Sequence, residues 1–189
     1  MKMKVKIGVS ARHIHLSEED FNILFPNEEL GLYKEMIQKP NFASDKKVTI
    51  RNNDREINNI RVVGPFRHDT QVELSKTDCY TLRVDAPLSN SKDLVNGAEI
   101  EIVNGDKSIK RKAAIIQNRH IHISNKQADK LGLKNEQIVK VKIDTIKGGI
   151  LDNVHIKTGD DFSLELHLDT DDANAFMIDS STEGEILND

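Results

Sequence analysis

One six-residue phrase occurs twice in this chain, and it constrains the fold more than any other feature. The first copy is Arg-His-Ile-His-Leu-Ser at residues 12–17, and the second is Arg-His-Ile-His-Ile-Ser at residues 119–124. Each copy follows an apolar, β-rich run and ends on a serine that is followed three residues later by Asp or Gln, which is a helix-start signal. The chain therefore predicts a strand, a His-x-His pair and a capped helix, used twice. Such an internal repeat implies two halves of similar structure.

The histidines of the repeated phrase indicate a metal site. In extended backbone, residues two apart point to the same side, so His13 and His15 present two imidazoles to one point, as do His120 and His122. Neutral imidazole binds Zn²⁺ at about 2.0–2.1 Å. A single His-x-His pair is weak evidence, because such pairs also occur as surface or capping residues. Two copies, which together retain four of the chain's 7 histidines, favour a metal site.

Composition narrows the classes of function. The 189-residue chain is 37% hydrophobic and has a net charge of -4, so it lacks the basic surface expected of a nucleic-acid-binding protein. It has no run of about 20 apolar residues that predicts a membrane span. The N-terminus lacks the apolar block of a signal peptide. The single cysteine, Cys79, excludes an intramolecular disulfide framework and is typical of a reducing cytoplasm. A lone cysteine is more often a small buried apolar residue than a nucleophile.

Short strand patterns separated by turns predict a mainly β fold. We expect strands at residues 48–50, 57–63, 71–74, 99–103, 138–143, 149–156 and 162–168, with a type I′ turn at Asn104-Gly105. We expect helices at residues 18–25 and 125–131, and a short third helix capped by Thr170. The long crossover helices of a parallel α/β fold are missing. The pattern therefore predicts small β-barrels with short capping helices.

Two segments are expected to lie outside the regular structure. Residues 27–44 contain Gly, Pro and many polar residues, and we interpret them as an irregular excursion and a candidate contact of a homodimer. Residues 180–189 are polar and are expected to form a frayed tail.

Two strands outside the phrase carry polar side chains on one face. Glu73 lies on the polar face of its strand, where it can complete a His/His/carboxylate metal set that leaves a position open for substrate. Glu165 and His167 share the polar face of a strand whose other face is leucine. Taken alone, His167 is as well explained by a solvent-facing residue. Arg67 can bind an oxyanion with its guanidinium fork, although, taken alone, an arginine here is more often an ordinary surface residue.

Longer motifs then point to one known family. They are spread over nearly the whole chain, at residues 8–17, 62–67, 70–75, 119–122, 152–154 and 164–175. The chain resembles the PduL-type phosphate acyltransferases (phosphotransacylases), which move an acyl group between coenzyme A and inorganic phosphate and use two zinc ions between two β-barrels. The resemblance implies a phosphate acyltransferase that converts propanoyl- or acetyl-CoA and phosphate into acyl phosphate and CoA. We expect direct attack of phosphate on the thioester at a di-zinc site.

The resemblance also implies a role for each site residue. One zinc ion would be bound by His13, His15 and Glu73, and the second by His120, His122 and His167. Arg67 matches the arginine that faces phosphate, and the contacts to coenzyme A would come from Val9, Ser10, Ala11 and Asn174. His68 and His155 match no ligand position.

Interleaved barrels and a cytoplasmic location follow from the same resemblance. Residues 1–11 and 118–189 would form the barrel with the second zinc site, and residues 12–117 the barrel with the first, with the di-metal site between them. Family members packaged in bacterial microcompartments carry an amphipathic extension before the first strand. Here the strand starts near Val5, so we expect a free cytoplasmic enzyme. We expect its substrates to be small molecules. The net charge and the lack of a long apolar run predict no nucleic-acid or membrane partner.

Two other functions fit the residues less well. A zinc-dependent hydrolase of thioesters or amides would use the same histidines but would not need phosphate. A non-catalytic module with structural metals is the weakest alternative, because structural zinc sites are usually rich in cysteine and this chain has one. The sequence does not indicate the preferred acyl chain length.

Overall fold

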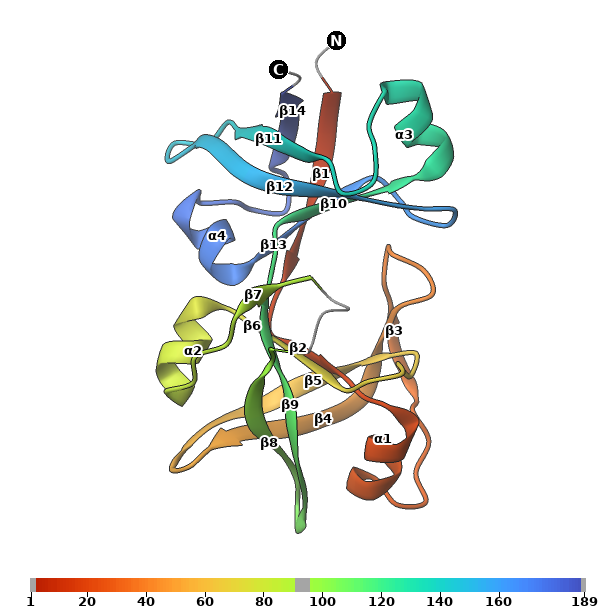
Figure 1. Ribbon diagram of the computed structural model, residues 1–189, viewed down its shortest axis with the longest axis vertical. Coiled ribbons are helices and arrows are strands. Elements are labelled where there is room, and N and C mark those ends of the chain that lie inside the picture. The colour runs from red at the N-terminus through yellow and green to blue at the C-terminus, as the bar shows by residue number, and fades with distance from the viewer. Residues whose placement is uncertain (1–2, 91–95, 188–189) are drawn as a thin grey trace. The chain divides into compact units, whose positions relative to one another are not determined.

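The computed structural model describes residues 3–90 and 96–187, which belong to two compact units (Figure 1). One unit comprises residues 11–117, and we call it the His13 barrel. The other combines the start of the chain, up to residue 10, with the residues from 118 onward, and we call it the His120 barrel. Each unit contains a closed ring of six strands with short helices outside it, so the predicted fold class of two small β-barrels is confirmed.

The His120 barrel closes in the strand order β1-β13-β10-β12-β11-β14, and β14 pairs with β1 to complete the ring. Its strands are β1 (Met3–Ser10), β10 (His120–Ser124), β11 (Ile138–Ile143), β12 (Gly149–Gly159), β13 (Glu165–Asp169) and β14 (Glu183–Leu187). Its helices are α3 (Asn125–Leu131) and α4 (Thr170–Ala175).

The His13 barrel closes in the order β4-β5-β2-β6-β9-β8, because β8 pairs with both β9 and β4. The ring strands are β2 (His13–His15), β4 (Phe42–Asn52), β5 (Arg55–Gly64), β6 (Gln71–Leu74), β8 (Ala98–Asn104) and β9 (Lys107–Gln117). Two further strands extend the sheet beyond the ring, β3 (Leu32–Glu35) beside β4 and β7 (Leu88–Ser89) beside β9. The helices are α1 (Glu18–Leu24) and α2 (Lys76–Leu82).

The two His-x-His strands occupy equivalent places in their barrels. β2 lies between a parallel neighbour, β5, and an antiparallel one, β6. β10 likewise lies between parallel β12 and antiparallel β13. The strand that precedes each phrase belongs to the other barrel, because β1 pairs with β13 and β9 pairs with β6. Each barrel is therefore completed by a strand from the other half of the repeat.

The isoleucine inside each phrase decides which way the histidines point. Ile14 and Ile121 are fully buried in the apolar cores of their barrels. Because side chains alternate along a strand, the flanking histidines lie on the outer face of the barrel wall. Each buried isoleucine stabilises the fold by about 1.5–3 kcal/mol. A register slip by one residue would lose that contribution and place imidazoles in the core, so the outward orientation is strongly specified.

The predicted helix starts after both phrases are confirmed. The Ser17 hydroxyl accepts a hydrogen bond from the backbone N–H of Asp20 at 3.1 Å, and Ser124 accepts one from Gln127 at 3.2 Å. These caps satisfy backbone donors that the first turn of a helix leaves unpaired. They also fix where each helix begins, directly after the capping serine.

Several local expectations are wrong. The tail contains β14, the segment expected to be irregular contains β3, and Asp169 rather than Thr170 caps α4. Of the two turn residues expected at positive φ, only Gly105 has it, so the hairpin forms without a type I′ turn. Helix α2 was not expected at all, although Ser75 and Asp78 form a reciprocal capping box at its start.

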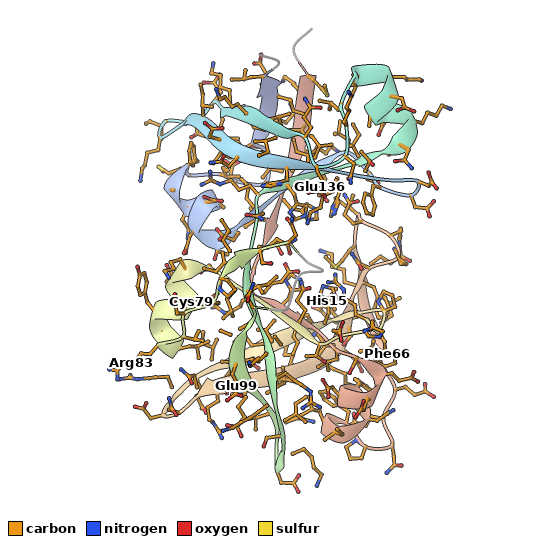
Figure 2. The ribbon with its side chains drawn as sticks, viewed as in Figure 1. His15, Phe66, Cys79, Arg83, Glu99 and Glu136 are labelled. Atoms are coloured by element: carbon orange, nitrogen blue, oxygen red, sulfur yellow. The ribbon has the colours of Figure 1, made fainter. Side chains whose placement is uncertain are left out.

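Helix α2 carries the chain's single cysteine, Cys79 (Figure 2). Its side chain is buried, and burial raises the pKa of the thiol. Cys79 is therefore a core residue of the His13 barrel, not an available thiolate.

No helix in the described part of the chain is long and apolar enough to cross a membrane.

Candidate functional site

The structure brings His13, His15 and Glu73 together on the outer wall of the His13 barrel, with candidate ligand atoms that lie within 4.8 Å of one another. His13 on β2 is directly opposite Glu73 on β6. The shortest distance between them, from His13 Nε2 to Glu73 Oε2, is 3.5 Å. Two imidazoles and a carboxylate are a donor set that zinc accepts, so these residues fit a metal ion.

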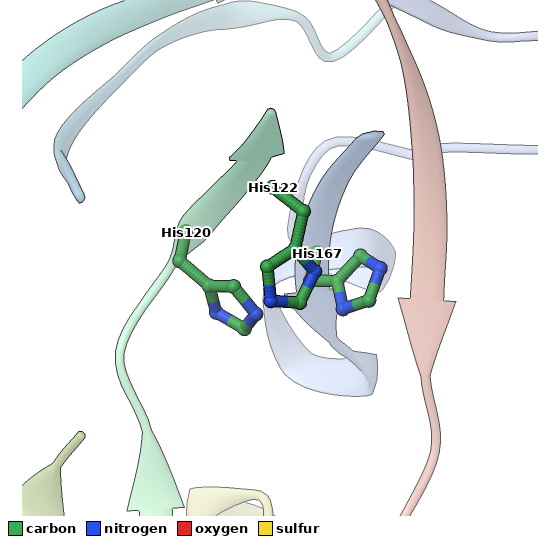
Figure 3. Close-up of side chains that lie close together, drawn as sticks. All are labelled: His120, His122 and His167. Atoms are coloured by element: carbon green, nitrogen blue, oxygen red, sulfur yellow. The ribbon is translucent and has the colours of Figure 1, made fainter. Parts of the chain in front are cut away.

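His120, His122 and His167 form the equivalent group on the outer wall of the His120 barrel (Figure 3). Their ligand atoms also lie within 4.8 Å of one another, and His120 on β10 is directly opposite His167 on β13. The Nδ1 atom of His122 is buried and has no hydrogen-bond partner in the described residues. A buried polar atom without a partner costs free energy, and a bound metal ion would give this nitrogen a partner. This observation fits metal binding by the group.

Backbone carbonyls orient three of the four histidines in the repeated phrases. Nδ1 of His13 lies 3.0 Å from the carbonyl oxygen of Ala11, and Nδ1 of His15 lies 3.0 Å from that of Val63. Nδ1 of His120 lies 2.8 Å from the carbonyl oxygen of Asn118. A carbonyl can only accept, so Nδ1 carries the proton and Nε2 keeps its lone pair for a metal.

Burial keeps three of the candidate ligands, His15, His120 and His122, neutral. It lowers the pKa of His15 and of His120 well below the ordinary histidine value. It also lowers the pKa of His122 to about 3, and the neighbouring His167 and Lys157 add to that effect. An imidazole with a depressed pKa is uncharged near neutral pH, which is the form that binds metal.

Arg67 lies beside the first group. Its backbone N–H donates to the carbonyl oxygen of Leu16 at 3.0 Å, and this bond joins the loop before β6 to the end of β2. Burial lowers the pKa of Arg67, while the negative charge of Glu73 opposes that shift. Within residues 3–90 and 96–187, its guanidinium makes no hydrogen bond or ion pair. A charged, mostly buried guanidinium without a partner is suited to an anionic ligand.

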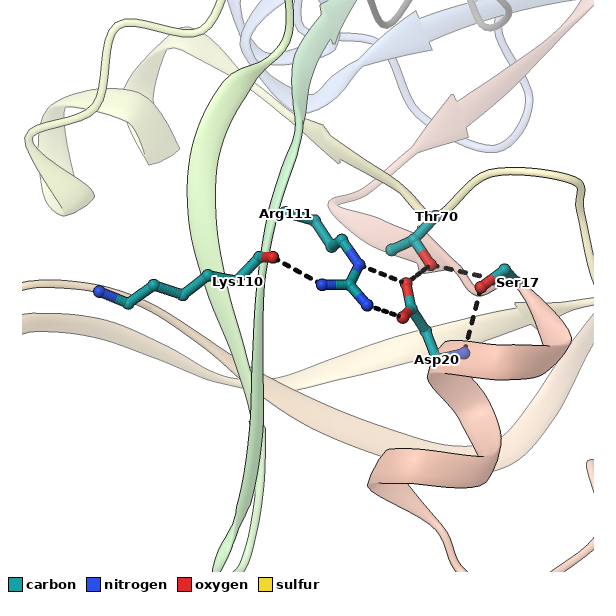
Figure 4. Close-up of polar contacts among 5 residues, drawn as sticks. All are labelled: Ser17, Asp20, Thr70, Lys110 and Arg111. Carbon is teal, nitrogen blue, oxygen red and sulfur yellow. Dashed lines mark hydrogen bonds and ion pairs between the residues drawn. The ribbon is translucent and has the colours of Figure 1, made fainter.

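A polar network holds the Arg67 loop in place, and sequence reasoning missed it (Figure 4). The carboxylate of Asp20, at the start of α1, accepts two hydrogen bonds from Arg111 on β9, at 3.1 and 2.5 Å, and one from the Thr70 hydroxyl at 2.5 Å. Thr70 Oγ1 in turn accepts a hydrogen bond from the backbone N–H of Ser17 at 3.0 Å.

An aromatic contact also joins the Arg67 loop to α1. Phe66 packs on Phe21 of α1, with ring centroids 5.1 Å apart (Figure 2).

The arginine that opens each phrase also has a structural partner. Arg119 binds both carboxylate oxygens of Asp172 at 2.7 and 2.6 Å, and Arg12 binds the carboxylate of Asp78. Both aspartates lie in the first turn of the helix that follows the third candidate ligand, α4 in one barrel and α2 in the other. The repeat of Arg12 and Arg119 in the sequence is the signal that could have identified these ties.

Three of the four residues expected to contact coenzyme A lie in the His120 barrel. Val9 and Ser10 lie at the end of β1, paired with Leu168 and Asp169, and α4 with exposed Asn174 follows directly. Ala11 follows Ser10 directly in the chain and is the first residue of the other unit.

The two unassigned histidines differ in their surroundings. His68 is exposed and forms an ion pair with Asp69. His155 pairs in register with His120, and its Nδ1 is buried without a hydrogen-bond partner in the described residues. Its place beside a candidate ligand was not predicted.

Comparison with known proteins gives one consistent result. The family described as phosphate propanoyltransferase matches residues 6–179 of this chain. The phosphate propanoyltransferase of Thermotoga maritima is 42% identical over 177 residues, which cover 92% of this chain and 84% of that protein. The phosphate propanoyltransferase of Levilactobacillus brevis is 37% identical over 185 residues, covering 97% and 89%, and that of Alkaliphilus metalliredigens is 37% identical over 187 residues, covering 98% and 88%.

Proposed function

Because the chain belongs to the phosphate propanoyltransferase family, and is thereby an acyltransferase, we propose that it transfers a short acyl group between coenzyme A and inorganic phosphate. The products in one direction are an acyl phosphate and free CoA. The observation that carries the proposal for this chain is the guanidinium of Arg67, which lies beside His15 and Glu73 and makes no hydrogen bond or ion pair with the residues that the structure describes. This planar, positively charged group can donate hydrogen bonds to a phosphate-sized anion next to a candidate metal group.

The candidate ligands form two metal sets in this proposal. His13, His15 and Glu73 hold one zinc ion, and the second is held by His120, His122 and His167. A zinc ion held by such a set would supply Lewis-acid chemistry, which polarises a carbonyl group and stabilises a thiolate. Imidazole also suits cobalt, nickel and copper, so the metal identity rests on the resemblance to the family and on metal analysis.

The protein's own residues act by positioning. Arg67 binds phosphate and holds one of its oxygens toward the thioester carbonyl carbon, while its charge offsets the repulsion between phosphate and the substrate. The new bond joins that carbon to the phosphate oxygen. The carbon–sulfur bond then breaks, and its electron pair leaves with the sulfur of CoA.

Direct transfer is favoured over a covalent enzyme intermediate. The only cysteine, Cys79, is buried in the barrel core, and burial raises the pKa of its thiol. It is therefore neither accessible nor readily ionised. The resemblance implies that Val9, Ser10, Ala11 and Asn174 contact coenzyme A. The location of Val9, Ser10 and Asn174 around the end of β13 in the His120 barrel is compatible with that role.

The deciding experiment is a phosphate titration. Metal-loaded protein is incubated with acetyl-, propanoyl- or butanoyl-CoA at increasing phosphate concentrations. Thiol release is measured with a chromogenic thiol reagent, and acyl phosphate is trapped with hydroxylamine. We expect thiol release to require phosphate and to match the acyl phosphate formed, and the three substrates give the chain-length preference. Thiol release at full rate without phosphate would contradict transfer and identify a hydrolase instead.

The homodimer remains a prediction with one supporting feature. Among the described strands, β3 pairs with β4 alone, and its residues Leu32 and Tyr33 are exposed, as is Ile37 just beyond it. We propose that this segment forms the contact between two copies, and sedimentation of the wild type beside Tyr33→Lys tests it. The cytoplasmic location is likewise a prediction.

A further inference from the structure

In each barrel, the residue two positions before the third candidate ligand forms a hydrogen bond with that ligand. In the His13 barrel, Gln71 Nε2 donates to Glu73 Oε1 at 2.5 Å. In the His120 barrel, the carboxylate Oε2 of Glu165 lies 2.7 Å from His167 Nε2, which therefore donates to it. Gln71 is 1% exposed and Glu165 is 6% exposed, so both are buried polar groups whose partners matter.

Strand register makes these two pairs equivalent. Glu73 is opposite the first histidine of its phrase, and His167 is opposite the first histidine of the other. Gln71 and Glu165 are opposite the second histidines, His15 and His122. The two barrels differ at both members of the pair: it is Gln71 with Glu73 in one barrel and Glu165 with His167 in the other.

The joint change keeps a donor facing an acceptor. A carboxylate ligand needs a donor beside it, and the Gln71 amide supplies one. An imidazole N–H needs an acceptor, and the Glu165 carboxylate supplies one. A mixed pair with Glu at both positions would place two negative charges within hydrogen-bond distance, where each disfavours ionisation of the other.

Gly8 provides independent evidence that the Glu165 carboxylate has a built place. Gly8 on β1 is paired with His167 on β13. A Cβ atom added at Gly8 would lie only 2.9 Å from Glu165 Oε1, which is closer than such contacts allow. The missing side chain at Gly8 therefore makes room for the carboxylate to reach His167. On β9, the equivalent position opposite Glu73 is Ile115.

We propose that Gln71 and Glu165 are positioning residues that select the metal-binding atom of the third ligand in each site, an inference that rests on the proposed function. Gln71 occupies Oε1 of Glu73, which leaves Oε2, the oxygen nearer to His13 Nε2, to face the metal. Glu165 occupies Nε2 of His167, which leaves Nδ1 as the ligand atom. A carboxylate behind a histidine also makes the imidazole a stronger ligand.

Zinc affinity measured one site at a time tests the proposal. A His13→Ala background keeps the His120-barrel site and a His120→Ala background keeps the other. Zinc is then competed with a chromophoric chelator. We expect Glu165→Ala to weaken zinc binding about 10–100-fold in the first background, and Gln71→Ala to do so in the second. In the opposite background, where the other site is kept, each change should leave zinc affinity unchanged, and a melting curve of each metal-free variant confirms that it is folded at the temperature of the titration. Glu183→Gln, an exposed carboxylate of the same barrel, is the matched control for Glu165.

An exchange of partners separates positioning from ordinary packing. His167→Glu alone places two carboxylates together, whereas His167→Glu combined with Glu165→Gln copies the pair of the His13 barrel. We expect the double variant to bind zinc at least about tenfold more tightly than the single one. A double variant that binds no better, or a Glu165→Ala protein with wild-type zinc affinity, would overturn the inference while leaving the proposed function intact. A wild-type protein that binds no metal would overturn both.

Discussion

At the scale of single residues, Arg67 is the side chain that separates phosphate binding from metal binding. It lies outside both candidate metal groups, and its guanidinium has no partner in the described residues. We expect Arg67→Ala to raise the KM for phosphate, to lower kcat, or both, by a combined factor of about 10²–10³, because a positioned charge at the transition state is lost. Arg67→Lys keeps the charge but loses the planar fork, so it should recover part of the activity. The assay is thiol release against phosphate concentration.

Two controls accompany the Arg67 variants. Zinc content and the melting temperature should equal those of the wild type, because the backbone hydrogen bond from Arg67 to Leu16 does not use the side chain. Normal phosphate kinetics in Arg67→Ala would refute its phosphate role. Loss of zinc or a lowered melting temperature would make Arg67 a structural residue.

His122 supplies a pH dependence with a definite sign. Burial lowers its pKa in the folded, metal-free protein to about 3, against an ordinary value of 6.5. The unfolded chain therefore binds a proton first as the pH falls, so the free energy of unfolding is highest above pH 6.5 and decreases between about pH 6.5 and 3. We expect His122→Gln to show a weaker decrease over that range. Urea unfolding of metal-free protein at several pH values measures this, and an identical slope in both proteins would contradict it.

At the scale of secondary-structure elements, the Asp20 network connects α1, β9 and the Arg67 loop. Asp20 is buried, whereas the side chain of Arg111 is 40% exposed, so solvent screens part of their interaction. We expect Asp20→Asn to lower the free energy of unfolding by about 1–3 kcal/mol, because hydrogen bonds to a buried charged group are lost. It should also raise the KM for phosphate, since Thr70 and Ser17 then hold the loop less firmly. Urea unfolding and phosphate kinetics measure the two effects.

Asp85→Asn is the matched control for Asp20. The side chain of Asp85 is almost fully exposed, and its contact with Lys76 is long, so we expect a change within about 0.5 kcal/mol. An Asp20→Asn protein as stable as this control would show that the network does not hold the loop.

The elements that were predictable are those whose signals are local. The capped helices after Ser17 and Ser124 and the alternation around Ile14 and Ile121 lie within a few residues of sequence, and the structure has them. Helix α2 has an equally local signal in the Ser75–Asp78 capping box, so it too can be predicted from its own segment.

Other elements depend on partners far away in the sequence. Strand β14 is short and polar, and it exists because β1 and β11 pair with it on both edges. The Asp20–Arg111 pair joins residues 91 positions apart. The hydrogen bond from His167 to Glu165 needs the space at Gly8 on another strand. No pattern within one segment indicates such contacts, whereas the ligand groups themselves follow from His-x-His spacing and strand faces.

At the scale of the whole molecule, β1 and β9 each belong to the barrel other than that of the phrase they precede. A cut between residues 117 and 118 therefore separates one complete barrel from one that has lost a strand. Residues 11–117 contain every strand of the His13 barrel. Residues 118–189 lack β1, which pairs with both β13 and β14 and contributes buried Met3 and Val5 to the core. The fragment 118–189 would therefore have an open sheet with two unpaired edges and an incomplete core.

We expect fragment 11–117 to fold and bind one zinc ion, and fragment 118–189 to remain unfolded and bind none tightly. A synthetic peptide of residues 1–11 should restore folding and zinc binding to fragment 118–189, because it supplies the missing strand in its native register beside β13 and β14. The same peptide with Val5→Asp should fail, since it places a charge in the barrel core. Circular dichroism and zinc titration of each mixture measure the outcome. If fragment 118–189 folds alone and binds zinc, β1 is dispensable and the barrel closes without the strand from the other half of the repeat.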